Sequence, residues 1–206
     1  MNDGWNEGKK SPLHVLTGSS SIMLRLMRSR CFSSSTGNVS TVGIVGLGLM
    51  GHGIAQVAAE KGFAVVAVET EQRFLDGGMK RIEGSVQKIA AKAVKKGKMT
   101  EADAGAAASA TLGRLTPTTD MSALASCDVV IEAVIEDIEL KERLYGALGS
   151  VVSDDCIIAS NTSSLPIAKM AAFCGRPSQT VGLHFFNPVQ LMQLVEVRLH
   201  AEHFTP

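Results

Sequence analysis

The sequence predicts an α/β fold with a doubly wound, mostly parallel sheet. Short apolar runs, typical of buried parallel strands, recur along the chain and alternate with longer helix-favouring segments. A glycine-rich turn directly follows the first of these runs, at the position where such sheets bind ligands. With 206 residues, 45% of them hydrophobic, the chain is long enough for one domain with a substantial core.

The first predicted strand, Thr41–Val45, leads into a glycine turn, and a helix is expected over 54–61. Together they form G-x-G-x-x-G in the strand-turn-helix context of Rossmann-type dinucleotide binding. The first glycine permits the tight turn, the second lets the backbone approach a pyrophosphate, and the third lets helix and strand pack closely. The predicted cofactor contacts in this turn are Gly46, Leu47, Gly48, Leu49, Met50 and Gly51.

A second buried run, 64–69, ends at Glu69, where a ligand for the ribose 2′-hydroxyl is expected. A carboxylate there would repel the extra phosphate of NADP, so the predicted cofactor is NAD. The alternative is an ordinary glycine-rich turn before a buried helix.

The rest of the predicted sheet follows from the same periodicity. Thr100 to Asp103 is expected to be a capping box that begins a helix. The polar run 161–166 follows a strand and is a candidate ligand site, although Thr162, Ser163 and Ser164 are also expected to cap a helix before Pro166. The remaining elements are expected to be a long helix at 72–98, strands at 112–115, 129–134 and 156–160, and a helix at 138–148.

A candidate acid/base pair lies near the end of the chain, where His184 and Glu196 each interrupt an apolar run. The turn signal Asn187-Pro188 predicts that strands near 181–186 and 191–197 lie side by side and bring the two groups together. A neutral imidazole accepts a proton from a hydroxyl, and a carboxylate fixes its tautomer. The alternative is a histidine that only fills the core.

Composition excludes several classes of function. The formal net charge of +0 gives no reason to expect nucleic-acid binding. No apolar run reaches the ~20 residues of a membrane-spanning helix. The four cysteines, at 31, 127, 156 and 174, lack C-x-x-C spacing, so we expect free thiols and no metal site.

The first residues differ in kind from the rest. Residues 1–38 are rich in serine and glycine, and we expect them to be disordered and to contain no strand. From Met23, a possible translation start, Arg25, Arg28 and Arg30 lie among apolar residues before a serine run, a composition typical of a mitochondrial presequence and of a matrix protein. The alternative is a tail without a targeting role. Residues 39–206 would then form the NAD-binding domain.

Five segments carry a resemblance to a known family. In order they are GLGLMGHGIAQVAAEKG (46–62), DVVIEAVIED (128–137), IIASNTSSLPI (157–167), VGLHFFNPV (181–189) and LVEV (194–197). The series resembles the NAD-binding domain of the L-3-hydroxyacyl-CoA dehydrogenases, including the 3-hydroxybutyryl-CoA dehydrogenases. The resemblance implies NAD-dependent oxidation of L-3-hydroxyacyl-CoA in fatty acid β-oxidation, or the reverse reduction.

The resemblance also implies roles for particular residues. His184 matches the family's base, Glu196 its partner, Ser163 the serine that orients the substrate, and Asn187 the active-site asparagine. Glu136 and Lys141, with Ser163 and Asn187, match further cofactor contacts. By ungapped register, contacts with coenzyme A fall on Ser85 and Lys92, whereas Lys88, Lys95, Lys96 and Lys98 are expected to form a solvated face. Glu69 replaces the family's usual aspartate, which keeps the charge and lengthens the reach.

The sequence departs from the family in one respect. Family members continue into a helical second domain that dimerises and covers the acyl chain, whereas this sequence ends at Pro206. A fragment or a truncated gene copy would have this form. We therefore keep a catalytically impaired NAD-binding fragment or regulatory protein as the alternative function. A 3-hydroxyisobutyrate-type dehydrogenase is disfavoured by the run from His184 to Pro188.

The composition before Asn38 yields a prediction about localisation. A fluorescent reporter fused after Asn38 is expected to enter mitochondria, because the segment from Met23 to Ser35 combines arginine and serine and lacks acidic residues. Changing Arg25, Arg28 and Arg30 to Glu should keep the reporter in the cytosol, as measured by microscopy and fractionation. A cytosolic signal from the unmutated fusion would contradict the assignment.

Overall fold

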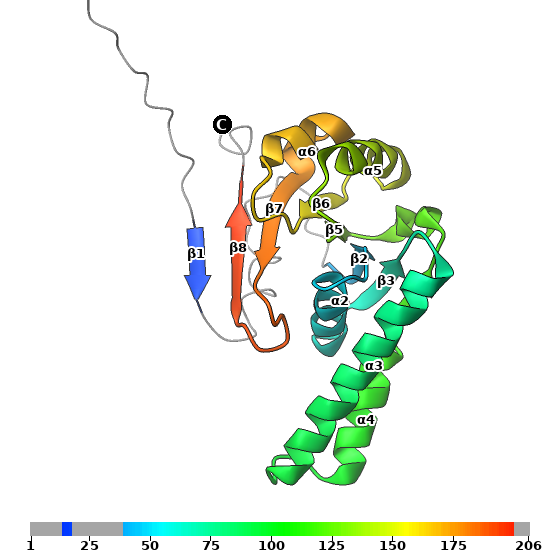
Figure 1. The fold of residues 1–206 in the computed structure, drawn as a ribbon, viewed down its shortest axis with the longest axis vertical. Helices are drawn as coiled ribbons and strands as arrows, with labels where there is room; N and C mark the ends of the chain where they lie inside the picture. Colours follow the sequence, from blue (N-terminus) through cyan, green and yellow to red (C-terminus); the bar gives the residue numbers. More distant parts are fainter. Residues whose placement is uncertain (1–13, 18–38, 200–206) are drawn as a thin grey trace, which may run out of the picture.

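The computed structural model describes residues 14–17 and 39–199, with the backbone alone described for the first segment. Its strands form one eight-stranded sheet in the order β1-β8-β7-β6-β5-β2-β3-β4 (Figure 1). The strands are β1 (His14–Thr17), β2 (Thr41–Val45), β3 (Ala64–Val68), β4 (Leu115–Thr118), β5 (Val129–Glu132), β6 (Ile157–Ser160), β7 (Thr180–Phe185) and β8 (Leu194–Arg198). The helices are α2 (Gly51–Glu60), α3 (Gln72–Lys95), α4 (Glu101–Leu112), α5 (Ile138–Val151) and α6 (Ile167–Cys174), with short 3-10 helices η1 (Met121–Ser126) and η2 (Pro177–Gln179).

The sheet is parallel from β7 to β4 and becomes antiparallel at β8 and β1. The chain runs outward from β2 through β3 to β4, then returns to β5 on the other side of β2 and continues through β6 to β7. The strand order therefore reverses between β2 and β5, and ligands bind at the carboxyl ends of the strands at such a point. The predicted doubly wound, mostly parallel sheet is confirmed.

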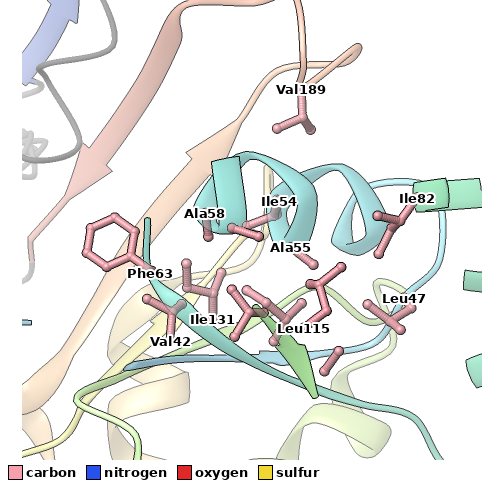
Figure 2. Packing of buried hydrophobic residues seen from close by; sticks show 14 of the residues in the cluster. Val42, Leu47, Ile54, Ala55, Ala58, Phe63, Ile82, Leu115, Ile131 and Val189 are labelled. Carbon is pink, nitrogen blue, oxygen red and sulfur yellow. The ribbon is translucent and has the colours of Figure 1, made fainter. Parts of the chain in front are cut away.

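Apolar residues fill both faces of the sheet because alternate strand residues point to opposite sides. One core cluster joins β2 and β5 to α2 and α3, with Ile44 and Ile131 fully buried in it. The other joins the opposite face to α5 and α6, with Val130 and Ile158 fully buried. Figure 2 shows α2 lying on the first face, with Ile54, Ala55 and Ala58 directed toward the sheet.

Helices α3 and α4 pack against each other and extend as an arm away from the sheet (Figure 1). The predicted start of α4 is confirmed with Thr100 as N-cap, and one half of the capping box forms: Thr100 Oγ1 accepts from the Asp103 N–H at 3.1 Å, while Asp103 Oδ2 accepts from the Thr100 hydroxyl at 2.7 Å. The long helix ends at Lys95, before the predicted 98, and a turn with Gly97 at φ 66° follows. The strand expected at 112–115 lies later, at Leu115–Thr118, because α4 extends through Leu112.

Two further expectations differ from the structure. The predicted N-cap from Thr162, Ser163 and Ser164 is wrong: α6 has Pro166 at its N-cap without a side-chain cap, and the Thr162 hydroxyl instead accepts from the Leu165 N–H inside the preceding loop. We expected no strand before residue 39, yet His14–Thr17 pairs with β8. The rest of the predicted presequence lies outside the described residues.

Candidate active site

The turn after β2 has the geometry of a phosphate-binding loop. Gly46 has φ 90°, which favours glycine, and a Cβ on Gly51 would lie 1.7 Å from the Gly46 carbonyl oxygen. A Cβ on Gly48 would meet nothing within 4 Å, so this glycine faces open space. Helix α2 begins here without a side-chain cap, and its first amide groups and positive dipole end suit a pyrophosphate. The predicted turn therefore fits a dinucleotide.

Glu69 lies directly after β3 and reaches back to this turn. Its Oε1 accepts from the Leu47 N–H at 2.7 Å, and its Oε2 accepts from the Thr70 N–H at 3.2 Å. The half-buried carboxylate is thereby held beside the glycine turn, where the ribose of a dinucleotide lies in such folds. The glutamate side chain, one methylene longer than aspartate, reaches from the end of β3 to the Leu47 N–H.

Leu47, a predicted cofactor contact, is held within the turn by burial and hydrogen bonds. Its side chain is fully buried in the core, and its N–H is already bonded to Glu69. Its carbonyl oxygen accepts from Arg81 on α3 at 2.9 Å. Leu47 therefore anchors the turn, whereas Leu49 is 70% exposed and free to contact a ligand.

The predicted proximity of His184 and Glu196 is confirmed. Strands β7 and β8 pair antiparallel with these two residues opposite each other, and His184 Nδ1 lies 3.2 Å from Glu196 Oε2. Both side chains are about four-fifths buried, so the interaction is only weakly screened by water. The Phe186 ring lies 4.7 Å from the imidazole at a tilted angle and shields one of its sides.

A cavity of ≈ 350 Å³ joins this pair to the glycine turn. Its lining brings together residues from four strand ends: Met50 after β2, Glu136 after β5, Ser163 after β6, and His184 and Asn187 at the end of β7. The structure therefore places five of the predicted residues, Met50, Glu136, Ser163, His184 and Asn187, around one cavity. Asn161 also lines the cavity, and its side-chain oxygen accepts from the Phe185 N–H at 2.8 Å, which ties the β6–α6 loop to β7.

Lys141, a predicted cofactor contact, is not among the residues that line this cavity. Its side chain is 1% exposed, and its Nζ lies 2.8 Å from both carboxylate oxygens of Glu132 and 3.3 Å from Glu136 Oε2. With its three donors directed at these carboxylates, it presents none to the cavity. Lys141 therefore contacts Glu136 from the protein interior.

Glu132, at the end of β5, is a buried carboxylate that the sequence analysis did not single out. It is fully buried and also accepts from Ser160 Oγ at 2.7 Å and from Tyr145 Oη at 3.3 Å. Burial, together with the negative charge of Glu132, keeps the pKa of Tyr145 well above its usual value, so the phenol remains a donor. The sequence does contain a signal for this residue, because Glu132 interrupts an apolar run in the same way as Glu196.

Glu136 is the exposed end of this charged group. Partial burial would raise the pKa of its carboxyl, but hydrogen bonds from the Thr162 hydroxyl and the Ser163 N–H, with the positive charge of Lys141, hold the pKa below its usual value. The distances from Glu136 Oε1 are 2.7 Å to Thr162 Oγ1 and 3.0 Å to Ser163 N. Glu136 is therefore an anion that holds the β6–α6 loop.

A second cavity, of ≈ 410 Å³, lies between α3 and the β7–β8 loop. The predicted residue Ser85 lines it, but Lys92 does not, and Lys88, expected on a solvated face, does. The side chain of Lys92 is exposed elsewhere on α3. The remaining cationic lining comes from Lys80 and Arg81, and the β7–β8 loop contributes Pro188, Gln190 and Leu191.

Metal and disulfide chemistry find no support in the part of the chain that the structure describes. No group of three or more His, Cys, Asp or Glu side chains is arranged there to hold a metal ion. Cys127, Cys156 and Cys174 are free thiols, and burial raises the pKa of Cys127 to about 11. Cys31 lies outside the described residues. No helix within 14–17 and 39–199 has the length and apolar character needed to cross a membrane.

Comparison with known proteins identifies the family. Residues 41–203 match the family model described as 3-hydroxyacyl-CoA dehydrogenase, NAD binding domain. The chain is 48% identical over 155 residues to the probable 3-hydroxybutyryl-CoA dehydrogenase of Deinococcus radiodurans, covering 75% of this chain and 52% of that protein. It is 41% identical to the fatty acid oxidation complex subunit alpha of Psychrobacter arcticus, covering 80% of this chain and 22% of that protein.

A solved structure gives the same result. The (S)-3-hydroxybutyryl-CoA dehydrogenase of Ralstonia eutropha superposes with a TM-score of 0.70 at 38% identity, over 80% of this chain and 57% of that one. The chain thus spans about half the length of the 3-hydroxybutyryl-CoA dehydrogenases it matches. The matched residues include the glycine turn and the strands that carry His184 and Glu196, and the chain belongs to the 3-hydroxyacyl-CoA dehydrogenase family, whose NAD-binding domain it carries.

Proposed function

We propose that this protein oxidises the 3-hydroxyl group of an L-3-hydroxyacyl-CoA to a ketone with NAD, and catalyses the reverse reduction. The observation that carries the proposal is that His184, paired with Glu196, lines a cavity that is also lined by Met50 of the glycine turn. A proton acceptor and a dinucleotide site on one cavity are what the oxidation of an alcohol to a ketone requires.

His184 is the proposed base. The Glu196 carboxylate accepts a hydrogen bond from the Nδ1–H of His184 in the proposed tautomer, so Nε2 carries the free lone pair that takes the proton of the substrate hydroxyl. Glu196 then stabilises the imidazolium through a short contact in a largely buried setting. Bound NAD supplies the acceptor for the hydride that leaves C3. In the reduction, His184 returns the proton to the carbonyl oxygen.

Ser163 and Asn187 are the proposed orienting groups. Both are exposed polar residues on the lining of the cavity that holds His184, and they come from separate loops after β6 and β7. Hydrogen-bond donors at two points around a carbonyl or hydroxyl oxygen restrict its orientation toward the base. Glu136 lies on the same lining and completes the polar side of the cavity.

The second cavity is the proposed site for coenzyme A. Lys80, Arg81 and Lys88 place three positive charges along one side of α3, which suits the phosphates of the coenzyme. Leu191 and Pro188 give the opposite side an apolar surface for a pantetheine chain. Ser85 remains a proposed contact, whereas Lys88 replaces Lys92 as the proposed cation.

We further propose a place in fatty acid oxidation and in the mitochondrial matrix. The name of the Psychrobacter relative and the arginine- and serine-rich segment from Met23 support these two proposals. Dimerisation through a second helical domain, as the family resemblance implies, is likewise a proposal for the whole protein.

The alternative function is an NAD-binding protein with little or no turnover. The observation in its favour is the shape of the cavity beside His184. The cavity beside His184 is open, and water entering it would screen charges and leave the substrate unconstrained.

The position of Glu69 predicts a preference for NAD over NADP. The carboxylate beside the glycine turn repels a 2′-phosphate, so NAD is expected to bind more tightly in calorimetric titrations. Glu69→Gln keeps the acceptor for the Leu47 N–H and removes the charge, and should reduce the preference by about tenfold or more. The matched control is Glu71→Gln, at an exposed site two residues further along. Equal affinities of the unmutated protein for the two cofactors would refute the role of Glu69.

The geometry of the His184–Glu196 pair predicts the effects of two substitutions. His184→Ala should lower turnover by roughly 10²–10⁴-fold with little loss of NAD affinity, because the proton moves only in the transition state. Glu196→Gln should give a smaller loss, because the imidazole keeps a hydrogen-bond partner and loses only the stabilising charge. Both are measured by steady-state kinetics in a form that reduces acetoacetyl-CoA. Unchanged rates in both variants would make His184 a core residue.

The location of the two half-sites predicts how residues 34–206 behave on their own. They should bind NAD, because the glycine turn and Glu69 are local to β2, α2 and β3. Reduction of acetoacetyl-CoA should be weak or absent, because lost positioning costs about 10²-fold in rate for each ~2.7 kcal/mol of barrier. Adding a separate helical domain from a full-length relative should restore part of the rate.

Two results would contradict these expectations, one for turnover and one for NAD binding. Reduction at the full rate by residues 34–206 alone would show that no further domain is required. A folded sample, shown by circular dichroism, that does not bind NAD would refute the nucleotide site itself.

A further inference from the structure

A network of buried charges lies directly beneath the β6–α6 loop. Glu132 at the end of β5 and Lys141 on α5 form its centre, with 0% and 1% of their side chains exposed. Tyr145 and Ser160 donate to the same carboxylate, at 3.3 and 2.7 Å. The desolvation of two charges is costly, and an apolar pair of similar volume often stabilises a fold as well or better. A contribution to the stability of the fold is therefore a weak explanation for the presence of the Glu132–Lys141 pair.

The network reaches the surface at Glu136, beside the cavity. Lys141 Nζ lies 3.3 Å from Glu136 Oε2, and the Glu136 side chain is 40% exposed. The same carboxylate accepts from Thr162 Oγ1 at 2.7 Å and from the Ser163 N–H at 3.0 Å. A chain of direct contacts thus runs from the interior of α5 to the backbone of Ser163.

A second branch reaches the same loop from Glu132. Ser160 Oγ, which donates to Glu132, also accepts from the Thr162 N–H at 3.3 Å. The Thr162 hydroxyl in turn accepts from the Leu165 N–H at 3.0 Å. Both branches end on residues 162–165, and Ser163 lies on the cavity lining together with His184.

We infer that the buried Glu132–Lys141 pair is a positioning element of the active site, which holds Glu136 against the β6–α6 loop and so fixes Ser163 opposite His184. Neither Glu132 nor Lys141 touches the cavity, so both act through Glu136 and Ser160. The inferred consequence for catalysis rests on the proposed function, but the effect on the loop does not.

The loop contact itself is measured by hydrogen exchange of the Ser163 amide, followed by NMR on the whole chain without substrate or cofactor. The test variant is Glu132→Gln combined with Lys141→Met, which removes both charges and leaves no unpaired ion in the core. Exchange at Ser163 should become about tenfold faster or more, because its N–H loses a firmly held anionic acceptor. The amides of Val130 and Ile158 in the sheet should exchange as before.

Two further variants separate positioning from packing. Tyr145→Phe removes the longest of the contacts with Glu132 and keeps the volume, so exchange at Ser163 should not change. Glu136→Gln should accelerate exchange at Ser163 by itself, and combining it with the double variant should add little, because both act on one hydrogen bond.

The contrary outcomes are distinct. Unchanged exchange at Ser163 in the folded double variant, equal acceleration throughout the sheet, or the same acceleration in Tyr145→Phe would each overturn the inference. If the double variant does not fold, Glu136→Gln decides, because its side chain is partly exposed: unchanged exchange at Ser163 would overturn the inference, and faster exchange there would support it.

The kinetic consequence gives a second readout. In a form that reduces acetoacetyl-CoA, the double variant should lower kcat by about tenfold or more while the KM for NADH changes little, because substrate orientation is lost and the glycine turn is not touched. A rise in the KM for NADH at constant kcat would return Lys141 to the role of a cofactor contact. If no form reduces acetoacetyl-CoA, even with a separate helical domain added, the proposed function is contradicted, and the exchange data would still decide the positioning role.

Discussion

The contact between the first and third glycines of the turn after β2 is the constraint on which the rest of the site depends. Any Cβ on Gly51 would overlap the Gly46 carbonyl group, and this closeness places α2 directly on the sheet. The other side of α2 is packed as closely: a Cβ on Gly53 would lie 2.9 Å from Val189, and Gln190 donates to the buried Gln56 at 3.1 Å. Figure 2 shows Val189 on the side of α2 that faces away from the sheet. The helix that begins at the cofactor turn thus also supports the loop that carries Asn187.

Charge is used differently in the two halves of the site. Around the glycine turn, most of the charge comes from the backbone, as amide groups and one helix dipole. The carboxylate of Glu69 adds a side-chain charge. On the side of His184 the charges are side chains in a largely buried setting, where each interaction is stronger than in water and each unpaired group is more costly. Buried charged groups need several hydrogen-bond partners. This explains why Lys141 interacts with both Glu132 and Glu136.

The sequence predicted the fold well because its signals are local. Strand runs, the glycine turn and the capping box each depend on a few neighbouring residues, and the structure confirms them with shifts of a few residues at element ends. The pairing of His184 with Glu196 was also predictable, because a two-strand register with one turn between them leaves few alternatives. The positions of the Lys141 and Lys92 side chains could not be predicted in this way. Tertiary contacts decide where a lysine side chain on a helix points, and the helical period does not specify those contacts. Lys141 points into the interior toward Glu132, and one turn of register along α3 separates Lys88 at the cavity from Lys92 outside it.

These differences matter for how the protein is assembled. The cofactor half is built around β2, α2 and β3, consecutive elements that contact one another, and β2 also pairs with the distant strand β5. The half that holds His184 depends on β8, which joins the sheet antiparallel beyond the parallel core, and on loops after β5, β6 and β7 that are held by partly buried polar contacts. A weakened core on the α5 side would therefore disturb Ser163 and His184 while the glycine turn remained formed. The contacts that hold the glycine turn and those that hold the β6–α6 loop are thus made largely by different residues, although residues of both halves line the cavity beside His184.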